Sequence, residues 1–407
     1  MKQFTTLLLV CLLFQNLYGI EDGEDKNNSV AFIQPGFSIG KSVPSNSNFP
    51  ETNYQTNYAL SIGKLVFDPA KAWAVYLNYP ATGLTFSYTN LGNKDVFGSA
   101  YSVIPYITFN ISKKQFNSVQ IRIGLGTSYF TNHYDALQNT RNVAIGSTFT
   151  WTFQTSFYYN FYIHKYFDLN LGLRFIHHSN GHTQLPNLGL NSVLFSLSSK
   201  LFLDPVDKSY KVKYQKPKLD YSRQYFANLR IGMGLHEFGG PGTKTGDTKR
   251  GVNIVSLGVG AIYKQVLKVK LGLSYRFYHQ YYNYILDYKP GSYTNNPTLS
   301  ASNLIIYIGS ELLLGHVGIS GELGINIFKP FYKEHHKLYE DDEGVSYWLK
   351  KMLATRVGLK FYLKNTAKNP KNNIFLGVHL NANMGQADFS ELTVGVVHRF
   401  SKVTRQF

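Results

Sequence analysis

Three long segments of the chain alternate between apolar and polar residues, and this alternation constrains the fold more than any other feature of the sequence. They cover residues 149–163, 267–277 and 353–363. In the second of them Leu267, Val269, Leu271 and Leu273 alternate with Lys268, Lys270, Gly272 and Ser274. A period of two is typical of a β-strand with one apolar face, and about sixteen such segments follow one another along the chain. The sequence therefore predicts an all-β protein.

The composition favours a β-barrel that spans a membrane over a soluble β-sandwich. Aromatic residues make up 15% of the chain, with 31 Tyr and 29 Phe, and charged residues make up only 16%. Transmembrane barrels carry girdles of aromatic residues at both membrane interfaces, which explains the tyrosines. The net charge of +17 would suit nucleic acid. The basic residues are scattered and the N-terminus indicates secretion, so we expect no nucleic-acid partner. We expect the positive charge to attract anionic lipid headgroups instead.

The N-terminus has the features of a secretory signal peptide. Residues 1–19 contain a basic Lys2 and an apolar run too short to span a membrane, and residues 20–29 are an acidic and polar lead-in that we expect to be disordered. Cleavage is expected after Gly19, although Leu17, three positions before the cut, is larger than the small residues preferred there. Cys11, the one cysteine, lies inside the signal peptide, where lipid attachment is a lesser alternative. A mature chain without thiols has no disulfide, cysteine metal site or cysteine nucleophile.

The expected strands fall into two sets, residues 30–204 and residues 224–407, on either side of a basic linker at residues 205–223. Long loops alternate with short turns, as in outer-membrane barrels, and the linker alone falls on the side of the short turns. Two arrangements fit this pattern. One is a single transmembrane antiparallel barrel of about 14–16 strands, and the other is two tandem eight-stranded barrels.

A possible catalytic motif lies at the end of one strand, where residues 175–181 read Phe-Ile-His-His-Ser-Asn-Gly. The alternation of the strand places His177 and Ser179 on its apolar face and His178 and Asn180 on the other. A histidine two residues from a serine on one strand face can act as general base to a hydroxyl nucleophile. The simpler alternative is a pair of polar residues at the polar rim of a barrel.

This motif, followed by Pro-Asn-Leu-Gly-Leu-Asn at residues 186–191, resembles the outer-membrane lipid A 3-O-deacylases, the PagL-like family. The resemblance implies that the strands of residues 30–204 form a barrel that presents a His–Ser pair outward to lipid. It implies that His177 is the base, Ser179 the nucleophile and Asn180 a contributor to the oxyanion site. Residues 205–407 have no counterpart in the small enzymes of the family and suggest a larger relative.

Asn191 departs from the family pattern, because the family has an acidic residue near this position. Its phase places Asn191 on the apolar face of the next strand, across the hairpin from His177. An asparagine can accept the imidazole N–H and orient the ring, although it brings no charge to stabilise the imidazolium. The sequence therefore predicts either a weaker triad or an inactive relative.

Together these observations predict an outer-membrane serine esterase of a Gram-negative bacterium that removes an ester-linked acyl chain from lipid A or lipopolysaccharide. No cofactor and no metal ion is expected to take part. The alternatives are a porin-like or structural barrel without enzymatic activity, and a phospholipase. The sequence does not indicate the oligomeric state.

Overall fold

The structure is a computed structural model that describes residues 28–46, 49–111, 117–206, 223–243, 249–340 and 343–403. The predicted signal peptide, most of the lead-in and most of the basic linker lie outside these residues. The chain divides into two compact units. The first comprises Met1–Asn180 and Asn187–Leu219, and the second comprises Gly181–Pro186 and Asp220–Phe407.

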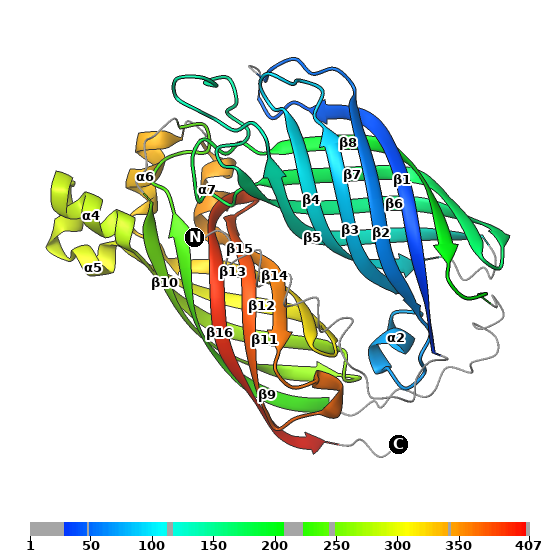
Figure 1. The fold of residues 1–407 in the computed structure, drawn as a ribbon. Helices are drawn as coiled ribbons and strands as arrows, with labels where there is room; N and C mark the ends of the chain where they lie inside the picture. Colours follow the sequence, from blue (N-terminus) through cyan, green and yellow to red (C-terminus); the bar gives the residue numbers. More distant parts are fainter. Residues whose placement is uncertain are drawn as a thin grey trace. The chain divides into compact units, whose positions relative to one another are not determined.

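The first unit is a closed barrel of eight antiparallel strands, drawn from blue to green in Figure 1. Each strand pairs with the next along the chain, and β8 closes the barrel by pairing with β1. The strands are β1 Ser29–Val43, β2 Gln55–Val66, β3 Ala81–Asn90, β4 Ser99–Asn110, β5 Ser118–Phe130, β6 Phe149–His164, β7 Phe167–Ser179 and β8 Leu190–Phe202. One short helix, α2 (Ala72–Tyr76), lies in the connection between β2 and β3.

The second unit is also a closed eight-stranded antiparallel barrel, in which β16 pairs with β9. Its strands are β9 Arg223–His236, β10 Arg250–Tyr263, β11 Leu267–Tyr278, β12 Ser302–Leu314, β13 Val317–Phe328, β14 Leu353–Tyr362, β15 Asn372–Asn383 and β16 Gln386–Val403. Its helices are α4 His279–Tyr288, α5 Pro297–Ser300, α6 Tyr332–Tyr339 and α7 Val345–Met352, with 3-10 turns at η1 Gly291–Asn295 and η2 Thr366–Lys368. None of the described helices is long and apolar enough to cross a membrane.

The sixteen strands confirm the all-β prediction, and two barrels form rather than one large one. The reason is the pairing of β1 with β8, which uses ten residue pairs from Phe32–Phe202 to Val43–Asn191 and leaves no free edge on the first set. Closure removes the unpaired backbone groups of an edge strand, so each set of eight is complete by itself.

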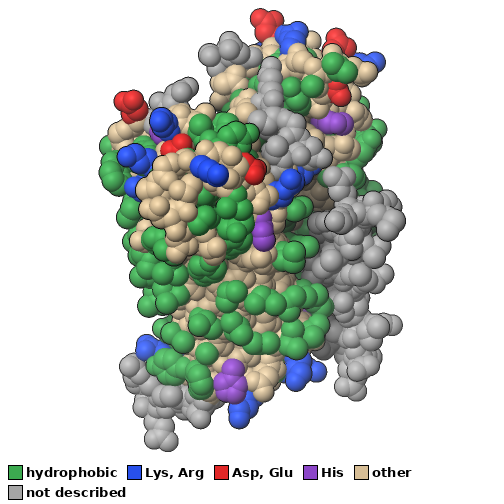
Figure 2. All heavy atoms as spheres, turned by 90° about the vertical axis from the view of Figure 1, so that its left-hand side faces the viewer, with side chains coloured by type: hydrophobic (Ala, Val, Ile, Leu, Met, Phe, Trp, Pro, Cys, Tyr) green, Lys and Arg blue, Asp and Glu red, His purple; other side chains and the backbone are tan. Residues whose placement is uncertain are grey.

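The outer wall of both barrels is apolar, as the alternation predicts. On β9 the exposed side chains are Leu229, Ile231, Met233 and Leu235, and on β8 they are Val193, Phe195, Leu197 and Leu201. On the face of the molecule seen in Figure 2, hydrophobic side chains cover the wall while charged side chains gather toward its two ends. An exposed apolar band with polar rims is the arrangement that a bilayer requires of a barrel.

The interior of the first barrel is filled rather than open. Arg122 is buried and donates to Gln34 Oε1 at 2.6 Å and to Thr108 Oγ1 at 3.1 Å. Arg174 donates to Asn57 Oδ1 at 2.8 Å and to the Tyr158 hydroxyl at 3.0 Å. Clusters of apolar side chains lie beyond this polar layer, one around Phe32 and Phe202 and one around Phe130 and Leu190.

The interior of the second barrel is filled by a network of buried charges. Glu322 accepts hydrogen bonds from Arg230, from Lys270 at 2.5 Å and from Arg356 at 3.2 Å. Arg356 also donates to both oxygens of Glu391, at 2.9 and 3.0 Å. Buried ions are tolerated only when paired and hydrogen-bonded, and this network satisfies that condition.

Candidate functional site

The strand β7 presents His177 and Ser179 on the outer face of the first barrel. Both follow the phase of Leu173, which is exposed, whereas Arg174 and His178 take the opposite phase and are buried in the interior. Two residues of one strand face lie about 6.8 Å apart along the strand, which is within reach of an imidazole. The phase of the strand therefore places both residues on the outer face, where His177 is half-buried and Ser179 is buried, with 5% of its surface exposed.

His177 is joined to Asn191 across the β7–β8 hairpin, where the two residues are directly paired. His177 Nδ1 and Asn191 Oδ1 lie 2.7 Å apart. Because an amide oxygen only accepts hydrogen bonds, the proton of this bond resides on Nδ1. Nε2 is then the ring nitrogen with a free lone pair, which is the state that a general base needs.

Ser179 is held by a residue that sequence reasoning left without a role. Asn187 Nδ2 donates to Ser179 Oγ at 2.9 Å, and Asn187 Oδ1 accepts from the backbone N–H of Asn180 at 2.9 Å. The second bond fixes the orientation of the amide, so its N–H₂ group faces the serine. In this contact Ser179 Oγ is the acceptor.

Asn180 lies just beyond the end of β7, which finishes at Ser179. Strict alternation would turn Asn180 to the interior, but the end of the strand releases it from that constraint. Its backbone N–H is engaged by Asn187, and the residue is buried. The structure thus places Asn180 in the turn beside Ser179, where the side chain of Asn187 binds its backbone N–H.

The segment that leads into β8 is held by backbone hydrogen bonds to the loop before β6. Leu188 N–H donates to Val143 O at 3.1 Å and Gly189 N–H donates to Ala144 O at 3.0 Å. Gly189 has a φ of +78°, which favours glycine, and a Cβ at this position would lie 2.9 Å from Cε1 of His177. A glycine is therefore required both by the backbone and by the space that the imidazole occupies.

His178 belongs to the interior and not to the site. Its Nδ1 lies 3.0 Å from Thr152 Oγ1, and its ring makes an edge-on contact with Phe130. Across the part of the chain that the structure describes, no three His, Cys, Asp or Glu side chains lie close enough together to hold a metal ion.

The chemistry that this arrangement can perform is acyl transfer. One end of β7 carries a hydroxyl bound by Asn187 and, two residues away on the same strand face, an imidazole whose Nδ1 is bound by Asn191. These are the components of a nucleophile activated by an oriented base.

Three comparisons bear on this barrel. Residues 33–200, nearly all of the first barrel, match the family model described as Lipid A 3-O-deacylase (PagL). The comparison with curated protein sequences gave no match.

Among solved structures, the crystal structure of the outer membrane enzyme PagL matches 41% of this chain and 98% of its own, with 16% identity and a TM-score of 0.29. The COG4313 outer membrane channel from Pseudomonas putida F1 matches 94% of this chain and 100% of its own, with 8% identity and a TM-score of 0.19. At these TM-scores the structural similarities add nothing to the family match. The family match covers less than half of the chain, and together with the apolar wall and polar rim described above it supports a PagL-like first barrel in an outer-membrane protein.

Proposed function

We propose that the first barrel is a serine esterase that hydrolyses an ester-linked acyl chain of lipid A. The observation that supports this most strongly is the contact of 2.7 Å between His177 Nδ1 and Asn191 Oδ1 on the lipid-facing side of the wall. A polar rim residue gains nothing from a locked tautomer, whereas a general base does.

In the proposed reaction His177 Nε2 takes the proton of Ser179 as Oγ attacks the carbonyl carbon of the ester. Asn187 is a positioning residue that keeps the hydroxyl directed at the base. The side chain of Asn180 stabilises the oxyanion in this reaction, since the backbone N–H of Asn180 is donated to Asn187. His177 then returns its proton to the departing sugar hydroxyl, and water releases the fatty acid by the same route.

The substrate is proposed to reach Ser179 sideways through the leaflet. The interiors of both barrels are filled by polar side chains, whereas the outer face of β7 and β8 is apolar around the site. The porin-like alternative requires an open interior, and the filled interiors give it no support.

The test is mass spectrometry of lipid A from cells that express the protein. The wild type is expected to remove one ester-linked acyl chain, and Ser179→Ala and His177→Ala to leave lipid A intact. Ser199→Ala is the matched control, because Ser199 also lies on the outer wall, on β8, away from the site. Intact lipid A with the wild type, or equal deacylation by Ser179→Ala, would refute the proposal, and release of fatty acid only from added phospholipid would identify a phospholipase instead.

A further inference from the structure

The loop between β7 and β8 carries the residues that hold Ser179, and its middle part belongs to the second unit. Asn180 and Asn187 lie in the first unit, whereas Gly181–Pro186 between them cluster with the second. Asn187 donates to the hydroxyl of Ser179 and accepts from the backbone N–H of Asn180. The two asparagines are therefore the flanks of a segment whose own position is set within the second unit.

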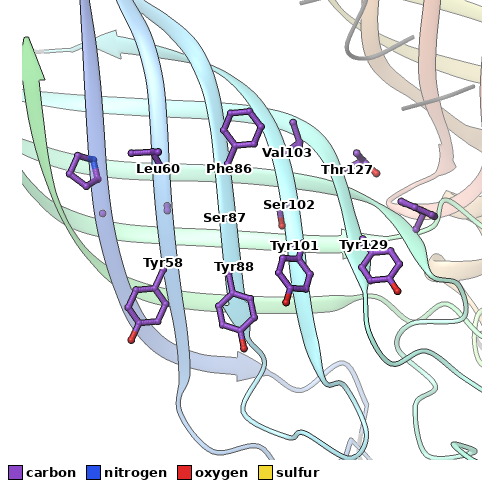
Figure 3. A pocket seen from close by; sticks show the side chains of 14 residues that line it. Tyr58, Leu60, Phe86, Ser87, Tyr88, Tyr101, Ser102, Val103, Thr127 and Tyr129 are labelled. Atoms are coloured by element: carbon purple, nitrogen blue, oxygen red, sulfur yellow. The ribbon is translucent and has the colours of Figure 1, made fainter. Parts of the chain in front are cut away.

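Strand pairing alone places the residues of the barrel wall. Tyr58, Tyr88, Tyr101 and Tyr129 are direct cross-strand partners from β2 to β5, and Figure 3 shows them side by side with their hydroxyls directed the same way. Residues 180–189 instead lie between β7 and β8, outside the strand pairs of the barrel. The contacts that this loop makes therefore decide how firmly the hydroxyl of Ser179 is held.

Glu237 holds the loop segment at two points. It directly follows the last residue of β9. Its backbone N–H donates to the carbonyl oxygen of His182 at 3.1 Å, and its carboxylate accepts from the backbone N–H of Leu185. His182 lies two residues after Asn180, and Leu185 lies two residues before Asn187. One residue of the second unit thus fixes the segment close to both asparagines.

The hydrogen bond from Leu185 to Glu237 is both buried and charge-assisted. Glu237 has only 1% of its surface exposed. A buried carboxylate loses its hydration and is stable only when hydrogen-bond donors replace the lost water. A hydrogen bond from a backbone N–H to a carboxylate is about twice as strong as one to a neutral oxygen. The carboxylate of Glu237 is therefore a strong and specific partner for the backbone of the segment.

Further contacts hold the same segment along its length. His182 Nε2 donates to the carbonyl oxygen of Gly239 at 3.1 Å, and the His182 ring stacks on the ring of His236 with 5.1 Å between centroids. Lys249 Nζ donates to Gln184 Oε1 at 3.1 Å. His182 has a φ of +64°, a left-handed conformation that is costly for a residue with a side chain and persists only where the surroundings impose it. The end of β9 and the loop that follows it provide these surroundings.

We propose that Glu237 is a positioning residue of the esterase, which acts on Ser179 through Asn187. The inference rests on the proposed function. The contacts run from the Glu237 carboxylate to the N–H of Leu185, along two residues of chain to Asn187, and from Asn187 Nδ2 to Ser179 Oγ. The second unit, whose interior is filled, then serves the reaction by fixing the loop that holds the nucleophile.

The expected effect is on the rate of the chemical step and not on substrate binding. When the segment is released, Asn187 no longer holds the hydroxyl of Ser179 in one position. A misplacement of about 1 Å can lower a rate about a hundredfold. The apolar wall that meets the lipid lies outside the loop and is unchanged. Loss of the bond between Glu237 and Leu185 should therefore lower kcat and leave KM nearly constant.

The first experiment separates the length of the Glu237 side chain from its charge. Glu237→Asp keeps the charge but is one methylene shorter, which withdraws its oxygens from the Leu185 N–H. Glu237→Gln keeps the length, and its amide oxygen still accepts a hydrogen bond. For purified full-length protein in detergent micelles, kcat and KM are measured for fatty acid release from lipid A. We expect Glu237→Asp to lower kcat at least tenfold with KM changed less than twofold, and Glu237→Gln to stay within threefold of the wild type.

Glu311→Asp is the matched control. Glu311 is also a buried glutamate of the second unit, and it accepts from Lys360 Nζ at 2.6 Å. Strand pairing through β11 and β10 relates it to Gln224 near the start of β9, whereas Glu237 follows the end of β9. Glu311→Asp should leave kcat unchanged. An unchanged kcat in Glu237→Asp, an equal loss in Glu311→Asp, or an equal loss in Glu237→Gln would overturn the positioning role.

The second experiment does not depend on turnover. Hydrogen–deuterium exchange is followed in the peptide that covers residues 180–189. Glu237→Asp should speed the exchange of the Leu185 and Asn180 amides at least tenfold, and Glu311→Asp should leave both rates as in the wild type. Unchanged exchange in Glu237→Asp would overturn the proposal. A wild type that does not deacylate lipid A contradicts the proposed function, while the exchange still decides whether Glu237 fixes the segment.

Discussion

Replacing Asn191 by aspartate should make the site a better esterase. The hydrogen bond of 2.7 Å to His177 Nδ1 is kept, because a carboxylate oxygen accepts as an amide oxygen does. What changes is the charge beside the imidazolium that forms when His177 takes the serine proton. Two unit charges about 4 Å apart attract by about 4 kcal/mol at an effective dielectric constant of 20 and by about 1 kcal/mol in water.

His177 and Asn191 are half-buried at the rim, so the gain falls between these limits. Since about 1.4 kcal/mol corresponds to a factor of ten in rate, we expect Asn191→Asp to raise kcat by roughly tenfold to a hundredfold. The assay is fatty acid release from lipid A in micelles under single-turnover conditions. Asn191→Leu should instead fall below the wild type, because the tautomer is no longer held.

The double variant Asn191→Asp with Ser179→Ala checks that any gain passes through the serine, and it should be inactive. Heat-modifiable migration on gels verifies that each variant is folded. A folded Asn191→Asp protein with unchanged or lower kcat would refute the reasoning, since it would mean that His177 does not become charged on the reaction path.

Three further predictions follow from the same contacts. Gly189→Ala should lower deacylation at least tenfold by pushing on the His177 ring, whereas Gly385→Ala, at a similar φ of +86° with open space around it, should cost stability alone; equal activities would contradict this. Glu322→Gln should destabilise the protein by about 3–5 kcal/mol in urea unfolding, because it leaves buried cations uncompensated, and a loss under 1 kcal/mol would speak against the network. In planar bilayers the purified protein should give no steady conductance, because polar side chains fill both interiors, and regular current steps would indicate a channel.

The alternation of the sequence was sufficient to predict which way the site residues face. Leu169, Leu171 and Leu173 lie on the outward face of β7, and His177 and Ser179 continue their alternation. The same rule applied to β8 places Asn191 opposite His177. Alternation is a local property, so it predicts the side of a strand reliably once the strand is long.

Features that depend on how distant strands meet were not accessible in this way. The choice between one barrel and two rests on whether β1 pairs with β8, and nothing within either strand specifies its partner.

Asn187 was missed for a different reason. It lies in the loop before β8, where no period indicates the direction of a side chain, and its two hydrogen bonds to Ser179 and Asn180 appear only when the loop is folded. The only signal in the sequence was its position between the motif and Asn191. Asparagine is common in turns for conformational reasons, so this position alone does not indicate a role at the site.

The second barrel contains a similar pair of polar residues on one strand. The comparison shows that the face on which such a pair lies matters more than the residue types themselves. His379 and Asn381 stand two residues apart on β15, as His177 and Ser179 do on β7, but both are fully buried. His379 Nε2 lies 3.1 Å from Ser320 Oγ, and Asn381 bridges Arg276 and Glu391 at 2.9 and 2.8 Å.

A shift of one residue along a strand exchanges its two faces. On β15 the polar residues occupy the inward phase, where they complete a network of buried charges and no lipid can reach them. On β7 they interrupt the outward, apolar phase, where a histidine and a serine add nothing to packing within the barrel. A polar pair on the face that the bilayer covers therefore differs from the structural polar residues of the same protein, and the proposed lipid chemistry depends on this difference.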